Sequence, residues 1–173
     1  IDIVGNIKVI KTNLPPRHVE IVDKKHPDTS FKNITTCILY DNQPKLIFNY
    51  SYKPCPYHKK PKIVMAHGMY GFPYLDAEGI YGISNRDKYV ILDRTIEDFI
   101  KLKAFLSTKF ALYLFECAKY RMKYLEKYIF ELIPDITKIE GFPEIITDDS
   151  IQEFFQLTKQ EKENIKKIYK KNY

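Results

Sequence analysis

The spacing of apolar residues changes at Thr95, and this change limits the chain to a small set of folds. Before Thr95, short runs rich in Val, Ile, Thr, Tyr and Phe are separated by Pro, Asn, Asp and Gly, which predicts strands and turns. After it, apolar residues recur at intervals of three and four, which predicts helices. The expected fold is α+β, with a small mixed or antiparallel sheet in the N-terminal part braced by C-terminal helices.

The predicted strands are short. They are Ile7–Ile10, Val19–Val22, Thr36–Tyr40, Leu46–Tyr50, Lys62–Ala66 and Tyr89–Leu92. Between the last two, residues 67–86 contain four of the six glycines, so an irregular, turn-dense region is expected there. Loops held on a rigid sheet are common positions for binding residues.

Four helices are predicted in the second half. The first begins at Ile96 after an N-cap at Asp93 or Thr95, and the last follows a capping box formed by Thr158 and Glu161. The other two are Lys109–Leu132, which ends before Pro134, and Ile151–Phe155, which Asp148, Asp149 or Ser150 can cap.

Length and charge favour one compact unit with two unlike parts. The 173 residues can bury a single core. Residues 1–95 form a strand-rich, basic recognition part with 14 Lys and Arg against 9 Asp and Glu. Residues 96–173 form a near-neutral helical bracing part, with 14 against 13. The positive charge of the first part favours a polyanionic partner.

The termini and the cysteines suggest an intracellular fragment. The chain starts at Ile1 and not at Met, which suggests a piece of a longer protein, and no stretch is apolar enough to cross a membrane. Three widely spaced cysteines do not form a disulfide framework, so reduced thiols and a cytoplasmic location are expected.

No motif for catalysis is visible, and neither a catalytic residue nor a metal site is predicted. The glycine-rich phosphate-binding, nucleophile-elbow and H-E-x-x-H motifs are absent. Cys55 and His58, followed by His67, have the spacing of half a zinc site, but the second closely spaced pair of ligands is missing.

The segment Asn42–Leu75 points to nucleic acid. It contains five lysines and no acidic residue, with seven Tyr and Phe side chains between them. Lysines can neutralise phosphates, and neighbouring polar side chains can reach the edges of bases. The segment therefore predicts contact with DNA.

Several short motifs in residues 60–173 resemble a known family. They are Leu75-Asp76-x-x-Gly79-x-Tyr81-Gly82, Arg121–Lys127, Ile133-Pro134-Asp135, Asp148-Asp149 and Phe154-Phe155-x-Leu157-Thr158. In this order they resemble the C-terminal target recognition domain of type II N6-adenine DNA methyltransferases and restriction–modification proteins, of the giant-virus or bacterial type. Residues 1–60 resemble no family that we can name.

The resemblance implies recognition of double-stranded DNA without catalysis by this chain. The family's methyl-transfer motif, Asn-Pro-Pro-Tyr/Phe, is absent, because Asn13-Leu14-Pro15-Pro16-Arg17 has an inserted Leu and an Arg in place of the aromatic residue. S-adenosylmethionine would then bind to a catalytic methyltransferase domain in cis or in trans, and the protein would work in a viral factory or in the bacterial cytoplasm.

The predicted DNA contacts combine the basic segment with the glycine-rich region. Lysines are assigned to phosphates, and His67, Tyr70, Asn85 and Arg86 to bases, because planar or forked groups suit the reading of base edges. The full set is Lys53, His58, Lys59, Lys60, Lys62, His67, Tyr70, Tyr74, Asn85, Arg86 and Lys88.

Two other hypotheses remain open. Pro134-Asp135 followed by Lys138 loosely matches a nuclease motif, although its spacing does not suit paired carboxylates on a metal. Alternatively, the predicted amphipathic helix Lys109–Leu132 could dock a protein partner instead of bracing the sheet.

Overall fold

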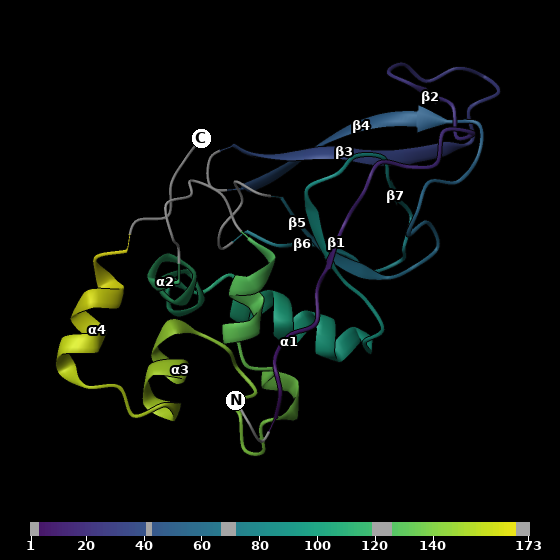
Figure 1. The fold of residues 1–173 in the computed structure, drawn as a ribbon. Helices are drawn as coiled ribbons and strands as arrows, with labels where there is room; N and C mark the ends of the chain where they lie inside the picture. Colours follow the sequence, from purple (N-terminus) through teal and green to yellow (C-terminus); the bar gives the residue numbers. More distant parts are fainter. Residues whose placement is uncertain (1–3, 41–42, 67–71, 119–125, 169–173) are drawn as a thin grey trace.

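A computed structural model describes residues 4–40, 43–66, 72–118 and 126–168, and its fold is α+β as predicted. Strands occupy the first half of the chain and helices the second (Figure 1). The strands are β1 (Ile10–Lys11), β2 (Ile21–Val22), β3 (Phe31–Tyr40), β4 (Gln43–Ser51), β5 (Lys62–Ala66), β6 (Tyr74–Asp76), β7 (Gly82–Ile83) and β8 (Lys88–Ile91). The helices are α1 (Ile96–Leu106), α2 (Lys109–Cys117), α3 (Asp148–Phe154) and α4 (Lys159–Lys166), with 3-10 helices η1 (Lys127–Leu132) and η2 (Ile136–Lys138).

The strands form two four-stranded sheets. The central sheet has the order β1-β8-β5-β6 and is antiparallel throughout. The hairpin sheet has the order β2-β4-β3-β7 and is mixed, because β7 runs parallel to β3. Its main element is the long β3–β4 hairpin, whose register shifts once, between Ile34 and Thr36.

The central sheet lies between the hairpin sheet and the helices (Figure 1). Successive side chains of a strand point to opposite faces. In β5, Ile63 and Met65 join the core cluster that contains α1 and α2, whereas Val64 and Ala66 join the cluster beneath the hairpin sheet. Burial on both faces explains why β5 is an unbroken apolar run after its first residue.

Strand boundaries agree with the sequence in the core and differ at the edges. β5 has the predicted bounds, but β3 begins five residues before the predicted Thr36. The predicted strand Ile7–Ile10 overlaps β1 (Ile10–Lys11) at Ile10 alone. The glycine-rich region after β5 also contains two short strands, β6 and β7, which its turn signals did not predict.

The predicted second helix, Lys109–Leu132, is longer than α2, which ends at Cys117. Residues 119–125 lie outside the described part of the chain, and the prediction is wrong over residues 126–132. Residues 127–132 form the 3-10 helix η1 instead, and an extended backbone at Glu126 (φ −109°, ψ 150°) precedes it. Phe130 of η1 packs against both Tyr89 and Phe115, with ring centroids 5.5 Å apart in each case. The apolar residues of η1 therefore reach the core without a continuous α-helix.

The helix caps were easier to predict. Thr95 caps α1 by accepting a hydrogen bond from the Asp98 N–H (3.1 Å), and Thr158 and Glu161 form the predicted capping box of α4. α3 starts earlier than expected and is capped by Thr147.

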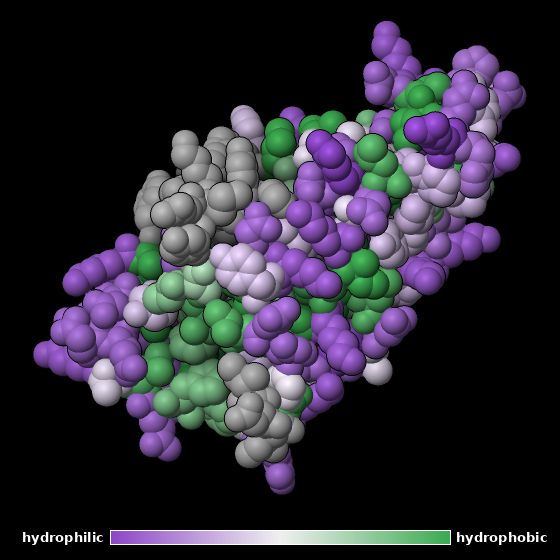
Figure 2. Space-filling view, in the orientation of Figure 1, coloured by the Kyte–Doolittle hydropathy of each residue, from purple (hydrophilic) through white to green (hydrophobic). Residues whose placement is uncertain are grey.

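Figure 2 shows one face of the molecule, on which hydrophilic side chains cover much of the strand-rich half and a hydrophobic area lies over the helical half. Within the described residues, no helix has the length and apolar character needed to cross a membrane.

Candidate nucleic-acid interface

The predicted contact residues differ in accessibility. Six are exposed or partly exposed, on the segment between β4 and β5 and on the turn between β7 and β8: Lys53, His58, Lys59, Lys60, Asn85 and Arg86. Lys62 and Lys88 are buried, and Tyr74 is packed against the core. His67 and Tyr70 lie outside the described residues.

Lys62 is used inside the fold. Its side chain has no exposed surface, and Nζ donates hydrogen bonds to Asp76 Oδ2 (2.6 Å), Lys60 O (3.1 Å) and Tyr57 O (3.2 Å). Burial lowers the pKa of Lys62, and the neighbouring Asp76 offsets part of that effect. An ammonium group has three donors, and these three acceptors take them all. Lys62 is therefore placed to hold the segment before β5, not to contact a phosphate.

Asp76 joins this segment to the following loop. Its carboxylate also accepts hydrogen bonds from the backbone N–H groups of Ile80 (2.9 Å) and Tyr81 (3.0 Å). Gly79 has φ +67°, and a Cβ there would lie 2.6 Å from the backbone nitrogen of Lys60. The Lys59 N–H donates to Gly79 O (2.8 Å). These contacts fix the backbone that presents the exposed Lys59 and Lys60 side chains.

Lys88 and Tyr74 are also occupied by internal contacts. Lys88 is 5% exposed, and its Nζ donates to the Arg86 carbonyl (3.0 Å). Burial lowers the pKa of Lys88 and raises that of the nearby Cys37 to about 12. Tyr74 lies 6.5 Å from the ring of Tyr81, and burial raises its pKa. Their placement does not favour the predicted contacts with DNA.

His58 and the two described residues predicted to read bases, Asn85 and Arg86, have defined positions. His58 Nδ1 lies 3.1 Å from the Ile80 carbonyl, and its ring meets Phe31 edge-on at 5.0 Å. Asn85 Oδ1 accepts from the Arg86 N–H (2.9 Å). The Arg86 side chain is 70% exposed and lies 3.5 Å from the Asp87 carboxylate, so its guanidinium is accessible.

A long stretch of the strand-rich half is almost free of acidic residues. Between Thr29 and Leu75, Asp41 is the only acidic residue, against six lysines. This stretch includes the hairpin sheet's two long strands and the segment before β5. Of its lysines, Lys62 alone is buried, and Lys45, Lys53, Lys59 and Lys60 are exposed. The stretch therefore presents positive charge to solvent with little compensation from its own residues.

Three hollows lie in a row between η1, the N-terminal segment and the segment before β5. Their volumes are about 500, 410 and 300 Å³. The first and second share Lys8 and Ile10, and the second and third share residues 92–94. We call this continuous surface the furrow. Its basic residues are Lys8, Lys59, Lys60, Arg94, Lys127 and Lys138.

A buried carboxylate organises the middle of the furrow. Asp135 has no exposed surface, and its Oδ2 receives Arg94 at 2.6 Å and Lys138 at 3.3 Å. Thr137 donates to Oδ1 at 2.7 Å. Burial alone would raise the pKa of Asp135, but the hydrogen bonds from Thr137 and Arg94, with the Arg94 charge, lower it overall. Asp135 therefore remains charged and fixes two cations beside each other.

Four of the furrow cations are not among the predicted contacts with DNA. Lys8, Arg94, Lys127 and Lys138 come from four separate parts of the chain, and none lies in a basic run. Only the tertiary fold places them along one surface, so no local sequence signal could have identified them as a group.

Of the residues considered for a metal, His67 lies outside the described part of the chain, and Cys55 and His58 make other contacts. Cys55 is buried and its Sγ lies 3.9 Å from Ser51 Oγ, while His58 is turned toward the Ile80 carbonyl. Asp135, considered as a nuclease residue, is occupied by two cations. Among the described residues, no group of three His, Cys, Asp or Glu side chains is arranged to hold a metal ion.

The segment that echoes the methyl-transfer motif is a surface segment. Leu14 is 62% exposed, and its neighbours Asn13 and Arg17 are also exposed. A flipped base requires an enclosing pocket with a stacking aromatic side chain. These residues do not fit that role or the binding of S-adenosylmethionine, and we derive no methyl-transfer step through them.

Comparison of the chain with protein-family models, with curated proteins and with solved structures found no match.

Proposed function

We propose that this chain binds double-stranded DNA through the exposed cations between β4 and β5 and between β7 and β8. The observation that supports this most directly is the stretch from Thr29 to Leu75, in which exposed lysines are opposed by a single acidic residue. Contacts between lysines and phosphates release counterions, so such a surface binds a polyanion most strongly at low salt.

The exposed residues suit two roles. Lys53, Lys59 and Lys60 are exposed and can contact phosphates. Arg86 has an accessible guanidinium, which can make paired hydrogen bonds to the edge of a guanine. Lys62 supports this surface from within, since it bonds the Lys60 carbonyl.

The resemblance to target recognition domains supports a more specific proposal. In it, the chain is the sequence-reading part of an N6-adenine DNA methyltransferase or restriction–modification protein, and a methyltransferase domain in cis or in trans binds S-adenosylmethionine and transfers the methyl group. The chain alone would then bind duplex DNA without methylating it.

Fluorescence anisotropy with a labelled duplex, measured between about 50 and 200 mM salt, tests DNA binding. The test variant replaces Lys53, Lys59 and Lys60 with Gln. We expect wild-type affinity to fall as salt rises. In the variant, the slope of log affinity against log salt should decrease by about 0.9 for each phosphate that is no longer neutralised.

A matched control removes the same charge elsewhere. The control variant replaces Lys159, Lys166 and Lys167, which are exposed on or just after α4, with Gln. It should bind as the wild type does. A wild type that does not bind at the lowest salt, or equal losses of affinity in the test and control variants, would contradict the proposal.

A further inference from the structure

The furrow extends the proposed interface beyond the residues named above. Lys59 and Lys60 belong to both, because they line its third hollow together with Arg94. From there the surface continues through Lys138 to Lys8 and Lys127. We infer that the furrow binds the phosphodiester backbone of the nucleic acid, with Lys8, Lys127 and Lys138 as additional phosphate-contacting residues and the largely buried Arg94 adding positive charge beneath them. This inference rests on the proposed function.

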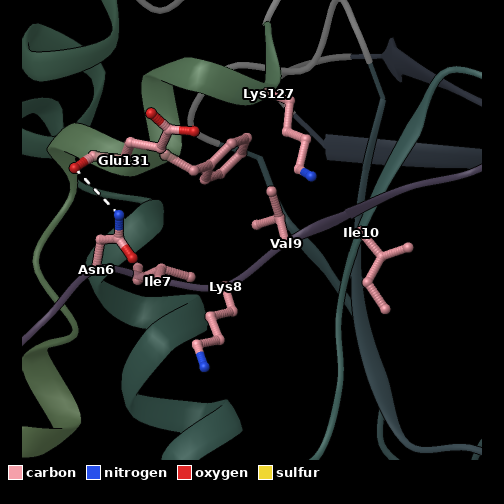
Figure 3. A pocket seen from close by; sticks show the side chains of 8 residues that line it. Asn6, Ile7, Lys8, Val9, Ile10, Lys127 and Glu131 are labelled. Atoms are coloured by element: carbon pink, nitrogen blue, oxygen red, sulfur yellow. Dashed lines mark hydrogen bonds between the residues drawn. The ribbon is translucent and has the colours of Figure 1, made fainter.

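Charge is the first argument for a phosphodiester backbone. Six basic side chains line the furrow, against the exposed Asp93 and Glu131 and the buried Asp135, which leaves a net charge of +3. Two walls supply this charge, since Lys127 comes from η1 and Lys8 from the N-terminal segment. Figure 3 shows Lys127 pointing from η1 toward the N-terminal segment, and Lys8 projecting from that segment away from η1.

Shape is the second argument. The hollows follow one another and share lining residues at each junction, so the furrow is elongated. A row of adjoining basic hollows suits a chain with regularly repeated negative charges better than a single compact anion. A nucleic-acid backbone is such a chain, and its phosphates are commonly contacted by Lys and Arg.

Preorganisation is the third argument. Asp135 holds the guanidinium of Arg94 at 2.6 Å and the ammonium of Lys138 at 3.3 Å. The Lys138 side chain is 55% exposed, so a ligand can reach it while it is held in place. Arg94 also donates to Thr137 Oγ1 (3.3 Å). Because these side chains are already ordered, less rotamer entropy is lost when a phosphate binds. Lys8, Arg94 and Lys138 line the middle hollow against the exposed Asp93 and the buried Asp135, so this hollow keeps a net charge of +1 for a ligand.

The furrow variant replaces Lys8, Lys127 and Lys138 with Gln. All three side chains are exposed, so the fold should be retained, which circular dichroism can check. In the anisotropy assay we expect its affinity for the duplex at low salt to fall at least about tenfold. The salt slope should decrease by about 0.9 for each phosphate that the variant leaves without its cation. The control variant on α4 should change neither quantity.

The outcomes separate this inference from the proposed function. A wild type that fails to bind the duplex overturns both. A furrow variant that binds as the wild type does, with an unchanged slope, overturns the furrow alone if the Lys53, Lys59 and Lys60 variant still loses affinity.

Competition experiments distinguish the ligands that share this chemistry. We expect an unlabelled duplex to displace the labelled one at a much lower concentration of anionic groups than inorganic phosphate or a poly-glutamate peptide. Equal competition by inorganic phosphate would indicate a site for single anions, and equal competition by the peptide would indicate an acidic protein partner. Either result overturns the assignment to a phosphodiester backbone.

Discussion

At the scale of single residues, burial separates side chains that look equivalent in the sequence. Lys59, Lys60 and Lys62 belong to one basic run, yet the first two are exposed and the third is fully buried. The reason is that Lys62 begins β5 and points to the same face as Val64, toward the interior. Asp76 compensates the charge of the buried Lys62, and it lies 14 residues further along the chain.

Asp76→Asn should destabilise the protein by about 3–5 kcal/mol, because it leaves the Lys62 ammonium buried without a counter-charge. Urea unfolding at neutral pH measures the change. Asp87→Asn is the matched control, since its partner Lys11 is 3.3 Å away but both side chains are about 40% exposed. The control should lose less than about 1 kcal/mol. Similar losses of stability in both variants would show that the buried pair has no special role.

At the scale of secondary-structure elements, local signals predicted the starts of helices better than their ends. Thr158 is the predicted cap of α4 and Thr95 is one of the two candidates for α1, because capping depends on residues within one turn. The candidates for α3 were wrong, since Thr147 is its cap. The end of α2 at Cys117 has no such signal, since the apolar spacing continues past it. The 3-10 helix η1 depends on contacts of Phe130 with Tyr89 and Phe115, which are distant in sequence. For the same reason the exposed part of the candidate interface could be predicted, but the furrow could not.

Asp148 connects α3 to the start of α2, but in the sequence it stands out only as one of the acidic pair Asp148-Asp149. Asp148, in the first turn of α3, accepts hydrogen bonds from the N–H groups of Lys109 (3.2 Å) and Phe110 (3.0 Å) at the start of α2. Asp148→Ala should therefore cost about 1–2 kcal/mol, as for other N-caps. The exposed neighbour Asp149 provides the control, and Asp149→Ala should cost less than about 0.5 kcal/mol. Thermal unfolding of the two variants side by side would reveal the difference, and its absence would refute the interhelical cap.

At the scale of the whole molecule, Asp135 connects the strand-rich and helical parts. Its N–H donates to the Gly5 carbonyl (3.1 Å), next to a β-bridge between Asn6 and Pro134. Its carboxylate bonds Arg94, which lies between β8 and α1, and Lys138 in η2. The two parts also share the larger core cluster, in which residues of β5 and β8 pack against α1 and α2. Changes at Asp135 should therefore affect the unfolding of the entire chain.

The lowered pKa of Asp135 makes its contribution to stability depend on pH. A carboxyl group whose pKa is lower in the folded state stabilises the protein above its unfolded pKa, here 3.8, and loses that effect as pH falls through the folded value. Asp135→Asn should therefore cost about 3 kcal/mol or more at pH near 7, because Arg94 and Lys138 lose their buried counter-charge. The difference in free energy of unfolding between wild type and variant should become smaller below a pH of about 4.

Urea unfolding at several pH values measures this gap. Glu144→Gln is the control, because the 85% exposed Glu144 pairs with Lys101 only at the surface, and it should show no comparable narrowing. If the loss of unfolding free energy in Asp135→Asn were the same at every pH measured, the charge of the carboxylate would not be what stabilises the fold. The deficit would then come from the loss of its hydrogen bonds alone. A narrowing gap would instead show that the charge that orders the middle of the furrow also holds the two parts of the molecule together.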